Sequence, residues 1–513
     1  MTDLQRTDPH PSRYRLAVGL VALALAGCAV GPDFTRPTAT APDDWTSWRS
    51  ADASLRMPVD AAQALPARWW EAFGDPVLNG LEARAASASP DLRTAALHFA
   101  QARAQRSTTA AQGGPEVNAS GSINRQRQSE NGAATRLYDT LGSSLSSSSS
   151  SSSSSIDTSS LLSALSTPFT LYQIGFDASW ELDLWGRVRR SIEAADADVA
   201  QQAALLDLAR LSLASDVARN YFELRTTQRQ IRLMREDVAA LEERMGLLQA
   251  RVDGGVLDHT DLQRQRAELA ALKAQQPGLL AQEGASINQI ALLLGARPGA
   301  LQGELAPNPD GKADGRGALP DLALGLPSEV ALRRPDIRAA EARLHSATAG
   351  IGVARADLYP SIQLGAKFGF ESYLSGEFSD WGSRTWSIGP SISLPLFDHG
   401  RRKSVVHLRE LQQQEAAVNY QQTVLKAWQE IDDALSAYTA ERQQVQQLEA
   451  RVHSAGDAYA LAKARYDGGT TDYTPVLDSQ RGWLQARRDL VASQGRVNTR
   501  FAAVNKAVGN LVP

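Results

Sequence analysis

The stretch Arg251-Val-Asp-Gly-Gly-Val-Leu-Asp-His-Thr260 occurs a second time, in altered form, as Arg465-Tyr-Asp-Gly-Gly-Thr-Thr-Asp-Tyr-Thr474. The copies lie 214 positions apart (251 to 465), and Trp185-Gly186-Arg187 matches His399-Gly400-Arg401 at the same spacing. Leu294-Gly295 matches Val508-Gly509 in the same register, so no gap interrupts the alignment. A repeat of this length predicts a duplicated structural unit.

Apolar residues recur at alternating steps of three and four in both copies, which is the seam of packed helices. The positions are Ile231, Met234, Val238, Leu241, Met245, Leu248 and Val252, then Val445, Leu448, Val452, Ala455, Tyr459, Ala462 and Tyr466. A helix from Gly186 or Gly400 to its double glycine would be about 100 Å long. The double glycines break these helices, and Asp258 and Asp472 can cap the next ones. Each copy is therefore predicted to be a long helical hairpin, although a plain structural coiled coil has the same seam.

Three segments alternate apolar and polar residues one by one, which predicts strands with one apolar face. They cover 172–184, 362–370 and 386–396, and a weaker run covers 117–123. Their length and alternation suit transmembrane barrel strands, although a half-buried soluble sheet has the same pattern. No segment after the N-terminal signal reads as a transmembrane helix, so a membrane crossing would have to use strands.

Two polar loops join these strands in pairs. The first contains the serine-only run 146–155, which cannot build a core and is expected to be disordered, and the second covers 373–384. Long polar loops suit the external face of an outer-membrane barrel. Four strands cannot close a barrel, and open strand edges are not tolerated in lipid. Strands in the membrane would therefore require several protomers to share one barrel.

The N-terminus has the three regions of a secretory signal. A polar start with Arg13 and Arg15 precedes the apolar run 16–26, and Leu25-Ala26-Gly27-Cys28 follows. This resembles a bacterial lipobox, which implies cleavage before Cys28 and acylation of that cysteine. The alternative is an ordinary buried thiol, but a buried thiol has no reason to follow an export signal. Ala29 stands where an Asp often retains lipoproteins at the inner membrane, and this favours the outer membrane.

Composition and motifs argue against several function classes. The net charge is −4, and the basic clusters Arg333-Arg334 and Arg401-Arg402-Lys403 are interpreted as solvated helix ends, so no nucleic-acid partner is expected. A single cysteine cannot form an internal disulfide or a cysteine zinc site. The histidines are scattered, and there is no Gly-x-Ser-x-Gly, P-loop or dinucleotide fingerprint. The chain is predicted not to be an enzyme and to use no metal or cofactor.

These patterns divide the chain into five parts. They are a signal peptide (1–27), a lipid-anchored segment (28–70), a first repeat (71–295), a linker or equatorial segment (296–326) and a second repeat (327–513). The first repeat contains a strand pair at about 115–126 and 170–185 and a helical hairpin over 186–295. The second contains a strand pair at about 359–372 and 384–397 and a hairpin over 400–509.

Several motifs resemble those of the TolC/OprM/NodT family of outer-membrane factors, and the likeness covers nearly the whole mature chain. They are Cys28-Ala-Val-Gly-Pro-Asp-Phe-Thr-Arg-Pro37, Trp69-Trp70-Glu-Ala-Phe73-Gly-Asp75-Pro76-Val-Leu78, Arg333-Arg334-Pro335-Asp336-Ile337, Tyr359-Pro360-Ser361 and Leu477-Asp478-Ser-Gln480. The resemblance implies an α+β membrane protein that forms a homotrimer. Its twelve-stranded transmembrane β-barrel, with four strands from each protomer, would continue into a twelve-helix periplasmic α-barrel.

The resemblance also implies partners and site residues. A periplasmic adaptor protein and an inner-membrane pump would complete an export path for small molecules such as drugs or aromatic acids. The adaptor is expected at the hairpin tips, Gly254, Gly255, Val256, Leu257, Gly468, Gly469, Thr470 and Thr471. Matching positions in the family carry acids that constrict the entrance, which singles out Asp261 and Asp478. Both acids could instead only complement a helix N-terminus, and the glycines could be only turns.

Two other functions remain open on the sequence alone. One is a lipid-anchored periplasmic coiled-coil scaffold without a pore, which would leave the amphipathic strands unexplained. The other is a type I secretion duct for proteins.

Overall fold

The computed structural model describes residues 29–37, 49, 51–56, 68–129, 167–255, 258–307, 327, 330 and 333–510. The signal peptide, Cys28 and the serine-only run lie outside these residues. The chain forms two compact units. The first joins Met1–Asp33 and Gln105–Ala194 to Thr348–Glu410, and the second joins Phe34–Ala104 and Ala195–Ala347 to Leu411–Pro513. Each compact unit thus takes material from both sequence repeats, so the repeat is not the compact unit of the fold.

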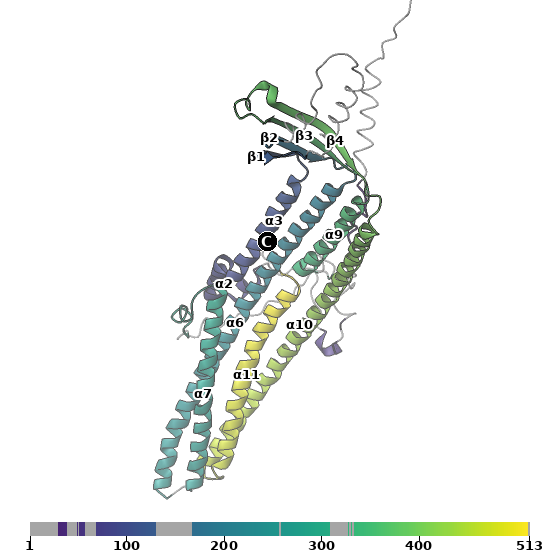
Figure 1. Cartoon of the computed structure of the whole chain (residues 1–513). Coiled ribbons are helices and arrows are strands. Elements are labelled where there is room, and N and C mark those ends of the chain that lie inside the picture. The colour runs from purple at the N-terminus through teal and green to yellow at the C-terminus, as the bar shows by residue number, and fades with distance from the viewer. Residues whose placement is uncertain are drawn as a thin grey trace, which may run out of the picture. The chain divides into compact units, whose positions relative to one another are not determined.

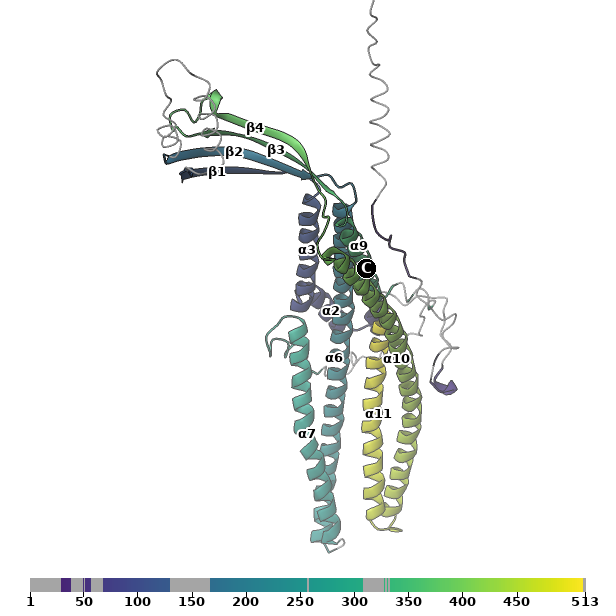
Figure 2. The same cartoon turned by 45° about the vertical axis from the view of Figure 1, so that its right-hand side comes forward.

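The first unit contains one antiparallel sheet in the order β1-β2-β3-β4 (Figure 2). Its strands are β1 (Glu116–Gln126), β2 (Phe169–Glu181), β3 (Ser361–Ser372) and β4 (Arg384–Ser393). β1 and β2 belong to the first repeat, and β3 and β4 to the second. The central β2–β3 pair, in register Phe176 to Phe368, therefore joins the two copies.

Two strands are shorter than the alternation predicted. β2 stops at Glu181 instead of near 185, because the chain turns where the amide of Leu184 donates to the carbonyl of Leu182 (2.8 Å). β4 stops at Ser393 instead of near 397. Its partner β3 begins at Ser361, directly opposite Ser393, so later residues of β4 have no strand to pair with.

The two faces of the sheet differ in chemistry. One face carries large apolar side chains that are exposed in the single chain, such as Ile123 (72% exposed) and Trp386 (70%). The other face is polar: Gln173 Nε2 donates to Glu371 Oε2 (2.7 Å), and Ser122 Oγ donates to Gln173 Oε1 (3.1 Å). Within the described part of the chain, neither β1 nor β4 has a strand on its outer edge.

The other long elements of the described chain are helices (Figure 1). The two longest, α6 (Arg187–Asp253) and α10 (Arg401–Asp467), have 67 residues each and begin and end in the repeat register. α7 (His259–Leu293) and α11 (Thr474–Ala507) return from their ends. The shorter helices are α2 (Pro76–Ala88), α3 (Pro90–Ala111) and α9 (Pro335–Ala356). Among the described helices, none is long and apolar enough to cross a membrane.

The main core of the second unit collects aromatic side chains from segments far apart in the sequence. Phe501 of α11 packs against Trp69, Phe73 and Tyr438, with ring centroids 5.6–6.0 Å apart. Asp75 caps α2, because its carboxylate accepts a hydrogen bond from the amide of Val77 (2.9 Å). These contacts hold the segment before α2 against the long helices.

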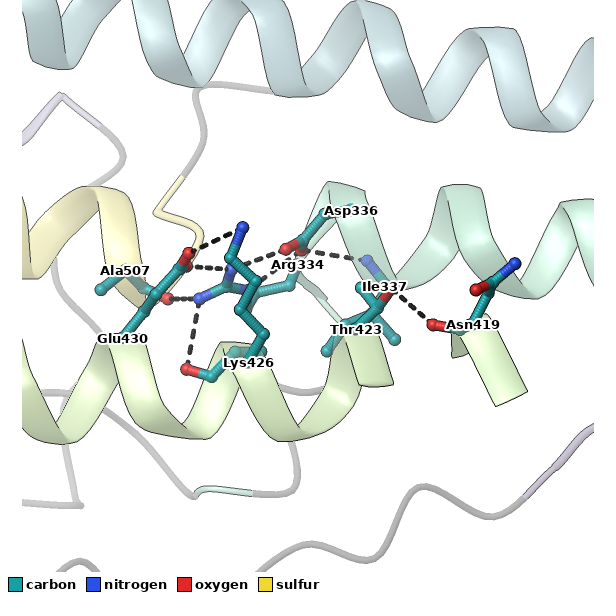
Figure 3. A network of polar contacts seen from close by, with 9 residues as sticks. Arg334, Asp336, Ile337, Asn419, Thr423, Lys426, Glu430 and Ala507 are labelled. Atoms are coloured by element: carbon teal, nitrogen blue, oxygen red, sulfur yellow. Dashed lines mark hydrogen bonds and ion pairs between the residues drawn. The ribbon is translucent and has the colours of Figure 1, made fainter. Parts of the chain in front are cut away.

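Arg334 joins three helices of the second unit (Figure 3). Its guanidinium donates to Asp336 (2.6 Å) at the start of α9, to Glu430 (2.7 Å) on α10 and to the carbonyl of Ala507 (2.6 Å) at the end of α11. The expectation of a solvated basic cluster is therefore wrong for Arg334, which is only 5% exposed. Tertiary partners on α10 and α11 supply the acceptors that let this charge be buried.

Candidate functional site

The two hairpin tips have closely similar turns. Gly254 continues α6 through a hydrogen bond from its amide to the carbonyl of Ala250 (3.0 Å), and Gly468 does the same to Ala464 (3.0 Å). The next residues, Gly255 and Gly469, both have φ of 72°. Only glycine adopts this left-handed conformation without steric cost, and this explains the double glycine in each copy.

Most of the described tip residues predicted as docking positions are exposed. Gly254, Gly255, Gly468, Gly469 and Thr470 are exposed, and Thr471 is half-buried. Val256 and Leu257 lie outside the described residues.

Contacts between the two hairpins fix the tips against one another. A buried cluster combines both hairpins and consists of Leu248, Val252, Leu262, Tyr473, Val476 and Leu477. Tyr466 packs against this cluster, and its hydroxyl accepts a hydrogen bond from Arg251 Nη1 (2.7 Å). Arg264 Nη1 donates to Thr474 Oγ1 (3.0 Å). Burial raises the pKa of Tyr473 to about 12, so this phenol stays neutral in the cluster.

The two acids predicted at the entrance differ in exposure. Asp261 keeps 17% of its side chain exposed and lies 3.5 Å from Arg264. Asp478 is 69% exposed and lies 3.8 Å from Arg481, whose Nε donates to Glu268 (2.9 Å). Asp478 is therefore the more accessible carboxylate, whereas Asp261 pairs with Arg264 of its own helix, and Arg264 in turn donates to Thr474 of the other hairpin.

The predicted helix caps are found at one tip only. Asp258 caps α7, because its carboxylate accepts a hydrogen bond from the amide of Thr260 (3.2 Å), and this bond lowers the pKa of Asp258. The prediction for Asp472 is wrong, since the residue before α11 is Tyr473, which makes no side-chain cap. Tyr473 takes helical dihedrals there and buries its ring in the tip cluster, so packing sets the start of α11.

The residues that follow Cys28 are held tightly within the first unit. The amide of Val30 donates to the carbonyl of Trp185 (3.0 Å), four residues after β2 ends. Gly31 has φ of 112°, and a Cβ there would lie 2.5 Å from Gly352 Cα. Asp33 forms an ion pair with Arg190 (2.6 Å). Cys28 itself lies outside the described residues, but its neighbours place the chain beside the end of β2.

Sequence reasoning missed a buried ion cluster between α6 and α11. Asp237 is nearly inaccessible to solvent and lies 3.2 Å from Arg487 and 3.6 Å from Arg488. Burial raises the pKa of Asp237 to about 6 in spite of these two arginines. Heptad spacing could not find this cluster, because its members come from different repeats. Across the described residues, no group of three or more His, Cys, Asp or Glu side chains could hold a metal ion.

Comparison with known proteins identifies this arrangement. The model of the family described as outer membrane efflux protein matches residues 81–296 and 326–510. The outer membrane protein OprJ of Pseudomonas aeruginosa is 32% identical over 90% of this chain and 88% of its own. The toluene efflux pump outer membrane protein TtgC of Pseudomonas putida is 29% identical over 96% and 95%. The outer-membrane channel OprN has the same fold, with a TM-score of 0.80 and 30% identity over 94% of this chain and 99% of its own. The chain belongs to the outer membrane efflux protein family.

Proposed function

We propose that this outer-membrane efflux channel works as a homotrimer that inserts a shared twelve-stranded barrel into the outer membrane. The observation that carries the proposal is the sheet itself. It exposes an apolar face with Ile123 and Trp386, and β1 and β4 have no strand on their outer edges among the described residues. Lipid would cover the apolar face, and β4 of one protomer would pair with β1 of the next. Three protomers would leave no open edge.

The long helices would continue the duct through the periplasm as a twelve-helix tunnel, and a periplasmic adaptor and an inner-membrane pump would complete the efflux path. A duct of this kind needs no cofactor, because the pump supplies the energy and selects the cargo. TtgC is described as a toluene efflux protein. For this chain we propose small organic molecules, such as drugs, aromatic acids or solvents, as cargo.

Purified protein in a planar bilayer tests the channel directly. The proposal expects discrete single-channel conductance and a trimer in detergent. A lipid-anchored scaffold would give no conductance, and that result would refute the proposed channel. Export of a drug, rather than of a protein, from cells that carry the chain would separate small-molecule efflux from type I secretion.

Acylation of Cys28 would provide a second anchor. Ala29 lies 3.0 Å from a Cβ built on Gly186, and Val30 is bonded to Trp185, so the lipid would join the chain beside the end of β2. Cys28→Ser should abolish palmitate labelling and leave trimers in the outer membrane, because the barrel also holds them. Labelling that persists in this variant would contradict the lipobox.

Asp478 would form the main ring of carboxylates at the periplasmic entrance, with Asp261 in support. Threefold symmetry repeats each acid three times around the axis, and rings of this type attract cations. The double variant Asp478→Ala with Asp261→Ala should raise conductance and weaken block by multivalent cations added from the periplasmic side. Asp457→Ala is the matched control, because Asp457 is an exposed carboxylate on α10 away from the tip. Equal conductance and equal block in the double variant and the control would show that the acids serve only the helix ends.

The glycine tips would receive the adaptor. Substitutions at Gly255 and Gly469 would combine added bulk with backbone strain, since any side chain is strained at φ of 72°. Gly468 lies at the end of α10 without a positive φ, so Gly468→Phe adds bulk with less strain. It should lower drug resistance while trimers still assemble. Gly278→Phe on α7 is the control, because Gly278 has no atom within 4 Å of a built Cβ. Equal resistance in both variants would show that the tips are only turns and do not bind the adaptor.

A further inference from the structure

A carboxyl group lies in the apolar stripe of α2. The stripe that α2 buries consists of Leu78, Leu81 and Ala85, at the spacing of one helix face, and Glu82 shares it. Glu82 is only 5% exposed, and its Oε1 has no hydrogen-bond partner among the described residues. Burial raises the pKa of this carboxyl well above its usual range. An isolated acid at a core position costs stability, so this residue calls for a role other than packing.

Glu82 lines a cavity of about 470 Å³ within the second unit. The wall is mainly apolar and is contributed by Trp70, Leu92, Leu211 and Leu213. This volume lies in the range of sites that hold small organic molecules. An apolar wall that surrounds polar groups is also the usual composition of such sites.

A second acceptor lies in the same cavity. Asn79 is three residues before Glu82 on α2, and its Oδ1 is buried without a hydrogen-bond partner among the described residues. The charged residues of the lining are different, because they already have partners. Arg68 pairs with Glu71 (3.2 Å), and Arg210 pairs with Asp207 (3.1 Å). Among the described residues of the lining, the buried acceptors without a hydrogen-bond partner are therefore Glu82 Oε1 and Asn79 Oδ1, and each arginine is paired with a carboxylate.

We propose that this cavity binds a small organic molecule with a primary ammonium group on an aryl or alkyl body. The ammonium lies between Glu82 and Asn79 Oδ1, because its three N–H donors satisfy both acceptors. Trp70 and the leucines of the wall cover the apolar body. Burial favours the protonated form of the Glu82 carboxyl before binding, whereas the bound cation favours the carboxylate, so binding releases protons from Glu82 to solvent. This site goes beyond passive export, since none of its residues belongs to a strand or a hairpin tip.

Isothermal titration of the purified trimer with 1-naphthylmethylamine tests the proposal. Titrations near pH 7 in two buffers with different ionisation enthalpies measure proton release. We expect one saturable site per chain, and release of protons when the ligand binds. The alcohol 1-naphthylmethanol has the same ring system without the charge and should bind at least tenfold more weakly.

Glu82→Gln replaces the neutral acid with a neutral amide of nearly the same shape, so the fold should be kept. This variant should bind the amine at least tenfold more weakly and release no proton. Glu304→Gln is the matched control, because Glu304 is an exposed carboxylate of the same unit outside the cavity lining, and it should change affinity by less than threefold. Equal binding by wild type and Glu82→Gln would overturn the proposal. If that variant does not fold, equal binding of amine and alcohol by the wild type, or amine binding without proton release, would overturn it.

Discussion

Replacing Gly495 with alanine should destabilise the packing of α11 against α6. Gly495 is buried, and a Cβ built on it would lie 2.1 Å from Oγ1, 2.4 Å from Cγ2 and 2.8 Å from Cβ of Thr226. All three distances are far below ordinary van der Waals contact. Rotation of the Thr226 side chain cannot remove the clash, because the Cβ of Thr226 takes part in it. The helices must move apart, and overpacking of this kind costs about 1–3 kcal/mol.

The same helix provides a control of opposite sign. A Cβ built on Gly482 meets no atom within 4 Å. Gly482→Ala should therefore stabilise the protein by about 0.5–1 kcal/mol, through helix propensity alone. Guanidinium unfolding of the detergent-purified protein, followed by circular dichroism of the helices, measures both changes as shifts of the midpoint.

A second substitution tests the cause. Thr226→Ala removes Oγ1 and Cγ2 but keeps the Cβ at 2.8 Å, and so it should recover part of the loss when combined with Gly495→Ala. The two changes should be strongly non-additive, as expected for residues in contact. If Gly495→Ala is as stable as Gly482→Ala, or if Thr226→Ala brings no recovery, the close approach of α6 and α11 does not limit stability at this point.

Three further outcomes follow from the structure. Arg334→Met should lower the free energy of unfolding by on the order of 2 kcal/mol in the same assay, because it leaves the carbonyl of Ala507 unpaired. A loss below about 0.5 kcal/mol would contradict the network of Figure 3. The pKa of Asp237 is raised from 3.8 to about 6 in the folded state. Between these two pH values the folded state therefore holds a proton that the unfolded state has released. The protein should therefore become more stable as pH falls from 7 to 5. Asp237→Asn should flatten the pH dependence of the unfolding midpoint over that range. An unchanged slope would exclude Asp237 as the source of the pH dependence. Gly31→Ala places a Cβ 2.5 Å from Gly352 Cα and should make the segment after residue 28 more sensitive to protease, with Gly376→Ala, where nothing lies within 4 Å, as the neutral control.

The sequence alone determined the repeated architecture. Helix length follows from two local signals, the seam of apolar residues and the double glycine, and α6 and α10 span 67 residues each in the register that these signals predict. The strands follow from the alternation of single residues, which depends only on neighbours in the chain. Asp258 as a cap is local in the same way, since its partner Thr260 is two residues away.

Only the tertiary structure decided how the copies combine. The pairing of β2 with β3 joins residues nearly 200 positions apart, and the pairing of β3 with β4 ends β4 at Ser393, opposite the first residue of β3. Arg334 is buried because α10 and the end of α11 supply two of its acceptors, and these lie far from Arg334 in the sequence, whereas Asp336 is two residues away. The burial of Glu82 could not be predicted from the sequence for a related reason. A carboxyl in an apolar stripe becomes notable only when the surrounding helices enclose it, since enclosure sets both its missing partner and its raised pKa.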